Sequence, residues 1–199
     1  MQTANLQNQK GFTLVEIAIV LVIIGLLLGG VLKGQELITN AKIKAVTSDF
    51  ENISAAYYAY QDRTGNVAGD GTNATPRVYD GLISGDDIFW FDLKTEGFIG
   101  GELGAITDSD GPTHDLSGIW TAIPGGTVQV SGTAGTALFA TNHICASNVP
   151  DNFASGIDTK LDDGDPETGN IRSATMAAPL TLLGAYANTE TLNTLCKGL

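Results

Sequence analysis

The chain has 199 residues, of which 43% are hydrophobic and 16% are charged, and this composition excludes an intrinsically disordered protein. Its 25 glycines favour a loop-rich, largely β body. The formal net charge of -12 comes from residues 62–199, because residues 1–61 hold equal numbers of acidic and basic side chains. An acidic body repels nucleic-acid phosphates, so we expect it not to bind nucleic acid.

A long apolar run begins after eleven mostly polar residues. Residues 12–32 contain one charged side chain, Glu16, and as a helix they would span about 31 Å, the thickness of a bilayer core. A cleaved secretory signal is the first alternative. Secretory signals have a shorter apolar core followed by an A-x-A-like cleavage site, whereas this run is longer and no such site follows it. A buried core helix is the second, but one this long and apolar is unusual in a small soluble domain. We therefore predict a transmembrane helix over residues 12–33.

Small residues recur along this run, which contains Gly25, Gly29, Gly30 and Gly34. Small-xxx-small spacing lets helices approach closely in lipid. Interior glycines also weaken a helix locally. The pattern indicates a helix that packs against other helices or bends.

The helical pattern continues over residues 34–62 with one apolar stripe. Its members are spaced 3, 4, 3, 4 and 3 residues apart, which places them on one face: Ile43, Val46, Phe50, Ile53, Tyr57 and Tyr60. The sequence RTGNVAGDGTN then ends the pattern. We predict one continuous helix over residues 12–62, whose second half covers the body of the same chain.

Residues 63–199 predict a small α+β body. A short helix is expected over residues 86–96, with Asp86 or Asp87 as N-cap and Gly97 just past its end. Strands are expected at 118–123, 127–132 and 136–144, with a hairpin turn at residues 125–126. A second short helix should begin near Asp151, before an acidic loop. We expect an antiparallel sheet of roughly three to five strands on the helix stripe.

The chain contains two cysteines, Cys145 and Cys196. In a chain with a membrane segment, two thiols fit one disulfide in an oxidising compartment. Two unrelated buried thiols are the alternative. A disulfide, together with the acidity of the body, favours a C-terminus outside the cytoplasm.

The N-terminus closely resembles the class III signal of type IV pilins and type II secretion pseudopilins. The resemblance rests on the short leader, on Lys10-Gly11, and on FTLVEIAIVLVIIG, and it covers about 25 residues strictly. It implies a pilin-like fold, a long helix on a small sheet. It also implies that prepilin peptidase removes residues 1–11 by cutting between Gly11 and Phe12, and then N-methylates Phe12. Thr13 belongs to the same motif.

The resemblance also gives Glu16 a role. A carboxylate in lipid is costly unless it is paired, and cleavage would create a cationic amine on Phe12 at the same membrane depth. Family resemblance implies that Glu16 of one subunit meets the Phe12 amine of its neighbour. A Glu16 that contacts only its own helix N-terminus is the alternative, and the two are compatible. Many type IV pilins carry a proline near the position of Lys33, so the resemblance leaves open whether the glycine-rich segment melts in a filament.

Other candidate sites carry weaker signals. One acidic segment contains five clustered carboxylates: Asp158, Asp162, Asp163, Asp165 and Glu167. Major secretion pseudopilins often hold calcium in a C-terminal loop, so Asp162, Asp163 and Asp165 are candidate ligands, against a solvated acidic loop. His114 and His143 lack a nucleophile motif, so we expect neither catalysis nor another cofactor. Trp90 and Trp120 fit core positions better than a sugar platform.

These observations favour a structural subunit. The leading hypothesis is a prepilin in the bacterial inner membrane, single-pass with a periplasmic C-terminus, that polymerises into a type IV pilus or related filament. Its partners would be prepilin peptidase, identical or homologous subunits, an inner-membrane assembly platform and lipid. The first alternative is a pseudopilin of a type II secretion system, and the second is a monomeric, membrane-tethered binding domain.

Overall fold

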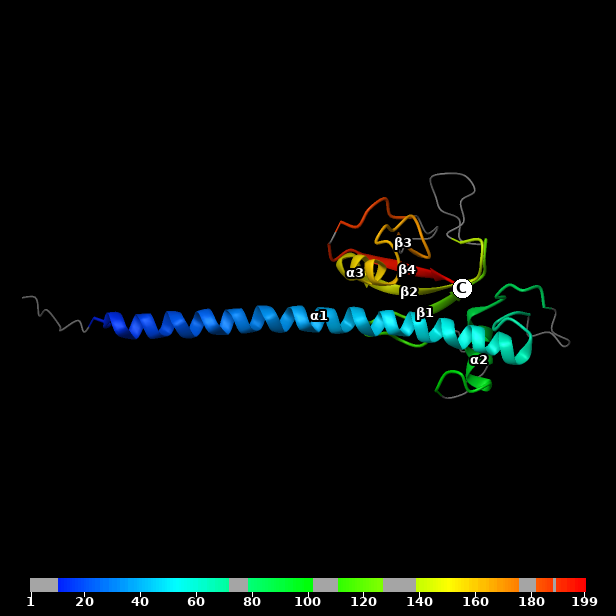
Figure 1. Ribbon diagram of the computed structural model, residues 1–199, viewed down its shortest axis with the longest axis horizontal. Helices are drawn as coiled ribbons and strands as arrows, with labels where there is room; N and C mark the ends of the chain where they lie inside the picture. The colour runs from blue at the N-terminus through cyan, green and yellow to red at the C-terminus, as the bar shows by residue number, and fades with distance from the viewer. Residues whose placement is uncertain (1–10, 72–78, 102–110, 127–138, 176–181, 188) are drawn as a thin grey trace, which may run out of the picture. The chain divides into compact units, whose positions relative to one another are not determined.

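A computed structural model describes residues 11–71, 79–101, 111–126, 139–175, 182–187 and 189–199. Its elements follow the chain as α1 (Leu14–Thr64), α2 (Asp86–Thr95), β1 (Trp120–Ile123), β2 (His143–Pro150), α3 (Asp151–Leu161), β3 (Ile171–Thr175) and β4 (Leu192–Gly198) (Figure 1). The contacts divide the chain into two compact units, Met1–Asn40 and Ala41–Leu199, and α1 contributes to both.

Helix α1 is 51 residues long, which agrees with the predicted continuous helix to within two residues at either end. All six predicted stripe residues are buried, and Phe50 and Val46 are completely inaccessible. They form one hydrophobic core with residues from α2, α3 and the sheet. The apolar period read from the sequence therefore identified the packed face of the helix correctly.

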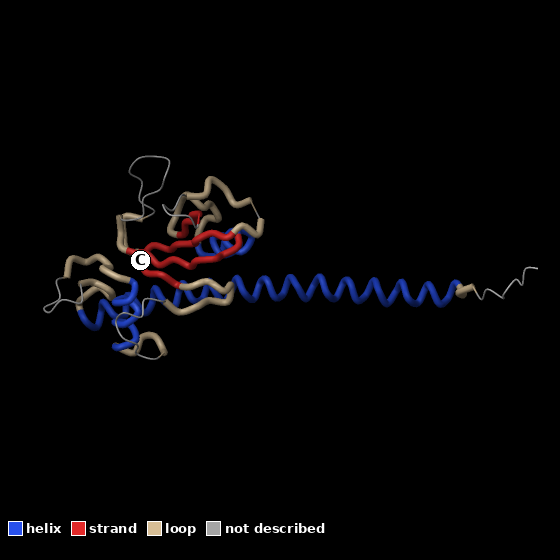
Figure 2. The backbone as a smooth tube through the Cα atoms, turned by 180° about the vertical axis from the view of Figure 1, so that it is seen from behind, coloured by secondary structure: helices blue, strands red, loops and turns tan. Residues whose placement is uncertain are grey.

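Four strands form one antiparallel sheet in the order β1-β2-β4-β3 (Figure 2). Strand β1 confirms the strand expected at 118–123. The strand expected at 136–144 was placed too early, because β2 begins at His143. Strands β3 and β4 were not predicted, and β3 begins within the segment expected to be an acidic loop. The expected strand at 127–132 lies outside the described residues. The chain is thus α+β and pilin-like, with a long N-terminal helix packed on a small antiparallel sheet.

The core is built from aromatic rings between α1, α2 and the sheet. The Phe50 and Trp120 rings meet edge to face with centroids 4.6 Å apart, and Phe89 meets Trp90 in the same manner at 4.9 Å. Trp90 and Trp120 are 1% and 2% exposed, which confirms their core positions. These rings fix α1 against the sheet through large buried apolar areas.

Helix α2 begins differently from the prediction. Its N-cap is Gly85, which has no capping side chain, and Asp86 is its first helical residue. The Asp86 carboxylate accepts hydrogen bonds from the indole of Trp90 and from the backbone N–H of Ala122 in β1. The side chain therefore joins α2 to the edge of the sheet instead of capping the helix. Gly97 follows the C-cap with a positive φ of 77°, as predicted.

Candidate assembly and processing site at the helix N-terminus

Glu16 and Thr13 form a capping box at the start of α1. The backbone N–H and the hydroxyl of Thr13 each donate to Oε2 of Glu16 at 2.8 Å, and the Glu16 N–H donates back to the Thr13 hydroxyl at 3.3 Å. Thr13 is the residue before the first helical residue, Leu14, and Glu16 lies three residues further on. This reciprocal arrangement satisfies backbone donors that the first helical turn leaves unpaired.

The capping box uses one oxygen of the Glu16 carboxylate. Among the described residues, no hydrogen bond reaches the second oxygen, Oε1, and Glu16 forms no ion pair. The neighbouring Phe12 side chain is 83% exposed. The carboxylate is therefore oriented by its own helix and still has acceptor capacity for another molecule.

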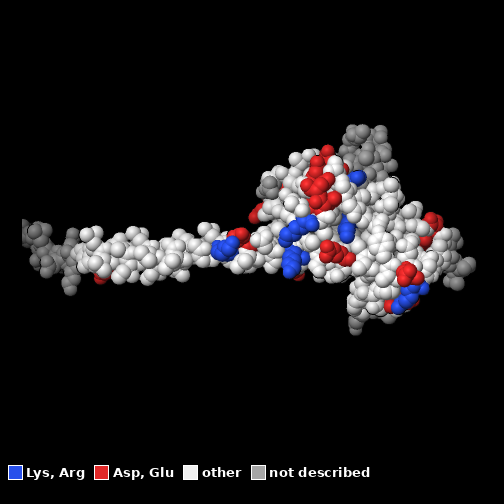
Figure 3. Space-filling model, viewed as in Figure 1, with Lys and Arg blue, Asp and Glu red and all other residues white. Residues whose placement is uncertain are grey.

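The surrounding surface of α1 is apolar, and no part of the chain that the structure describes covers it. Among the described helices, α1 is the one that is long and apolar enough to cross a membrane. On the face shown in Figure 3, the first half of the helix carries almost no charged side chains. Such a surface requires lipid or other helices around it.

The glycines of this segment have no close neighbour among the described residues. A Cβ atom added at any of them would meet nothing within 4 Å: Gly25, Gly29, Gly30 and Gly34. No contact with the described part of the subunit therefore requires small residues at these positions. Their proposed role in helix packing depends on a neighbouring molecule.

Comparison with known families gives a match over this segment. A family model described as the prokaryotic N-terminal methylation motif matches residues 6–32. The chain carries a type IV pilin-like class III signal. Comparison with curated proteins gives no match.

The matched motif indicates a structural protein of the pilin class, either a type IV pilin-like subunit or a pseudopilin. It implies processing by prepilin peptidase and assembly with other pilin subunits. The apolar helix at the N-terminus fits anchoring in the inner membrane. Gly11, Phe12, Thr13 and Glu16 all lie within the matched residues.

The predicted disulfide is present in the body. Cys145 of β2 and Cys196 of β4 are directly opposite in the strand register and are bonded to each other. They are buried with Phe139 and Ala174 in a second, smaller hydrophobic cluster. The bond joins the two central strands of the sheet and closes a sequence separation of 51 residues.

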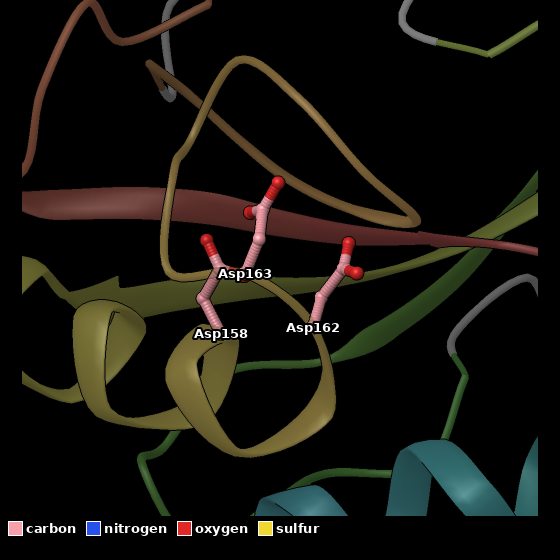
Figure 4. Close-up of side chains that lie close together, drawn as sticks. All are labelled: Asp158, Asp162 and Asp163. Atoms are coloured by element: carbon pink, nitrogen blue, oxygen red, sulfur yellow. The ribbon is translucent and has the colours of Figure 1, made fainter.

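The structure brings together three of the five carboxylates that the sequence singled out. Asp158, Asp162 and Asp163 offer oxygens that all lie within 4.8 Å of one another, whereas Asp165 is not part of this group (Figure 4). Asp158 comes from the last turns of α3, and the other two follow the helix directly.

The same carboxylates already accept hydrogen bonds from the loop. Asp162 accepts from the backbone N–H groups of Asn170 and Ile171, and Asp163 accepts from the Thr168 hydroxyl at 2.7 Å. Asp158 is completely buried and accepts from the Tyr186 hydroxyl at 2.7 Å. Burial raises the pKa of Asp158 to about 6, and the charges of Asp163 and Asp162 add to this rise. These contacts stabilise the loop within the chain itself.

The sequence prediction missed the capping box, although its signal is present. The pattern Thr-x-x-Glu before an apolar run is the signature of such a box. The sequence left open a contact of Glu16 with its own helix N-terminus, and the structure contains that contact through Thr13. The structure assigns Thr13 the task of orienting that charge.

Proposed function

We propose that the chain is the structural subunit of a type IV pilus or a related filament. Prepilin peptidase removes residues 1–11 and N-methylates Phe12, residues 12–33 span the inner membrane, and residues 34–62 continue the helix into the body. Residues 63–199 then lie in the periplasm until the assembly platform transfers the subunit into a filament. The matched methylation motif and the pilin-like fold support this proposal.

The observation that carries the proposal is the geometry of Glu16. Cleavage between Gly11 and Phe12 converts an amide nitrogen into a basic amine, and N-methylation keeps that amine cationic at neutral pH. The Thr13 backbone N–H and hydroxyl hold one carboxylate oxygen of Glu16 at 2.8 Å, and no described residue donates a hydrogen bond to the other oxygen. A neighbour's Phe12 amine can bind that oxygen without displacing the cap. Pairing the two charges removes the cost of keeping each of them alone in lipid.

This arrangement makes assembly conditional on processing. Before cleavage, Phe12 has an uncharged amide nitrogen, so Glu16 has no cationic partner at that position. After cleavage, every subunit carries one cation and one anion four residues apart. Each subunit can then bind one neighbour through its amine and another through its carboxylate, which is the head-to-tail contact that a helical polymer requires.

A pseudopilin of a type II secretion system is the alternative, and one observation favours it. The oxygens of Asp158, Asp162 and Asp163 are close enough to bind one divalent cation. Thermal unfolding of the processed protein with calcium and with a chelator tests this alternative. A calcium-dependent rise in Tm that is lost in Asp162→Asn and retained in Glu190→Gln, an exposed residue elsewhere in the body, would favour the pseudopilin.

Substitution of Glu16 tests the assembly role. Glu16→Ala should leave membrane insertion and the body intact but abolish filaments in a sheared surface fraction. Glu36→Ala is the matched control, because Glu36 is an exposed glutamate of the same helix that pairs with Lys33 at 2.7 Å. Normal filaments from Glu16→Ala would reject the proposed pairing.

A further inference from the structure

A second stripe runs along the exposed side of α1. Its members are spaced 4, 3, 4, 3 and 4 residues apart and all are exposed: Lys44, Ser48, Glu51, Ala55, Tyr58 and Asp62. This spacing places them on one face of the helix, separate from the buried stripe. We call these six residues the outer stripe. It belongs to the compact unit Ala41–Leu199.

The outer stripe carries separated charges that form no ion pair within the described part of the subunit. Among the described residues, Lys44 forms no hydrogen bond and no ion pair. Glu51 interacts electrostatically with Lys197, but the Lys197 ammonium donates its hydrogen bond to Ser54 at 3.0 Å. Lys33 and Glu36 of the same helix, by contrast, form an ion pair. A lysine seven residues before a glutamate is too far away to pair within one helix.

The assembly contact sets an axial offset between neighbouring copies. If the Phe12 amine of one copy binds Glu16 of the next, the two copies are displaced by four residues, or about 6 Å along a helix. Helical symmetry applies the same axial translation to every residue. Lys44 of the displaced copy then lies level with Ser48 of its neighbour, three residues below that neighbour's Glu51. A lysine and a glutamate can bridge this axial separation, because Lys33 and Glu36, three residues apart on one helix of this chain, pair at 2.7 Å.

We propose that Lys44 of one subunit pairs with Glu51 of the adjacent subunit, so that the outer stripe is a subunit interface. The pair can form when the two copies have the axial offset that the Phe12–Glu16 contact sets. This inference rests on the proposed function. Two small side chains, Ser48 and Ala55, alternate with the larger members of the stripe and allow two helices to approach. The four-residue offset places the large Lys44 and Glu51 of one copy beside the small Ser48 and Ala55 of the other.

Charge complementarity favours a second copy over lipid as the occupant. Lys44 lies eleven residues beyond Lys33, about 16 Å along the helix from the end of the apolar run. That distance places it beyond most of a headgroup layer, since the layer is roughly 5–8 Å thick on each side of the hydrocarbon core. Glu51 has a charge that anionic lipid repels. A copy of this chain offers both charges in the required order.

Charge reversal in the full-length, processed protein tests the pairing. Lys44→Glu and Glu51→Lys should each lower the yield of sheared filaments by about tenfold or more, because like charges then meet at the interface. The double variant Lys44→Glu/Glu51→Lys should restore assembly. The matched controls are Lys160→Glu and Glu190→Lys, which make the same charge changes at exposed positions of the body and should assemble normally.

A cross-linking experiment provides a readout that loss of folding cannot mimic. The described cysteines are both in the disulfide, so the double variant Lys44→Cys/Glu51→Cys should form a ladder of subunits with a short bis-maleimide in filaments. Either single cysteine variant should form no ladder. Protection of Cys145 and Cys196 from thiol labelling verifies the fold of each charge variant.

The outcomes separate this inference from the proposed function. Absence of filaments and of a processed Phe12 in the unmodified protein would overturn both. Normal filaments from both single reversals would overturn the interface alone. A defect in Lys44→Glu that Glu51→Lys does not rescue, together with normal assembly of Glu51→Lys, would assign Lys44 to lipid and also overturn the interface.

Discussion

Removing the Phe50 side chain should destabilise the body strongly, because this ring links α1 to the sheet. Phe50 is 0% exposed and packs edge to face on Trp120 with centroids 4.6 Å apart. Truncating a fully buried phenylalanine to alanine costs about 3–5 kcal/mol through lost transfer free energy and the cavity left behind. Single-domain stabilities are about 5–15 kcal/mol, so Phe50→Ala should remove a large fraction of the total.

The assay is thermal and urea unfolding of the full chain in detergent, followed by tryptophan fluorescence. Trp90 and Trp120 are both buried, so their emission reports the packing of the body. A loss of this size should lower Tm by on the order of 10 °C in a chain of this length.

Tyr58→Ala is the matched control for Phe50→Ala. Tyr58 lies on the same helix, but it is 52% exposed, so its truncation should change the free energy of unfolding by less than about 1 kcal/mol. Equal effects of the two substitutions would refute the assignment of the buried stripe as the packed face of α1.

Three further predictions follow from individual contacts. Cys145→Ser and Cys196→Ser should each lower the free energy of unfolding by about 4 kcal/mol in the chain-entropy model, because the bond closes a separation of 51 residues. Urea unfolding measures this loss. An unchanged free energy of unfolding after reduction of the parent protein would contradict the prediction. Acidification should destabilise the body through His114. Burial lowers the pKa of this side chain, and its Nδ1 accepts the Leu116 N–H at 3.2 Å, which only the neutral ring can do. The folded state therefore binds fewer protons than the unfolded state. The stability that the neutral His114 contributes is present above about pH 6.5 and is lost as the pH falls. His114→Gln should flatten the pH dependence of Tm relative to the parent. Thr13→Val should preserve cleavage at Phe12 but reduce filament yield, because the Glu16 carboxylate loses the hydroxyl that orients it; Thr13→Ser should retain assembly, and equal yields from both variants would count against the positioning role.

The long helix and its packed face could be predicted from sequence because both depend on local periodicity. The six stripe residues keep a regular apolar spacing over residues 43–60, and a helix of any sequence with that spacing presents one apolar face. Helix α3 was predicted for a similar reason, since Asp151 follows a proline and apolar residues recur after it. These features require no knowledge of distant contacts.

Strand β4 could not be predicted because its buried residues include polar ones. Asn193 is 1% exposed, and its side chain donates to Asp151 Oδ1 at 3.0 Å, 42 residues away in sequence. The disulfide and the register with β2 also place this strand. Burial of an asparagine is favourable only when such a partner exists, and local sequence does not show the partner.

Several carboxylates of the acidic body have structural roles that composition could not show. Asp70 accepts hydrogen bonds from the backbone N–H groups of Asp80 and Gly81, and Asp92 accepts from that of Gly69 at 3.0 Å. Asp86 links α2 to β1 in the same manner. Several carboxylates thus close loops within the chain, which is a role set by tertiary contacts.

At the N-terminus, the sequence predicted a processing motif but not the geometry of the Glu16 carboxylate. The family match at residues 6–32 agrees with the resemblance seen in Gly11, Phe12 and Glu16. The capping box adds that Glu16 is held through one oxygen by Thr13. The charge in the apolar run therefore has a local partner in the subunit and capacity for a second partner in a filament.

Mass spectrometry of subunits from sheared surface filaments tests the central proposal most directly. We expect filaments that contain this chain with its N-terminus at Phe12, without residues 1–11 and with one additional methyl group on the N-terminal amine. An intact Met1 on the membrane-bound protein, together with the absence of this chain from the filament fraction, would contradict it.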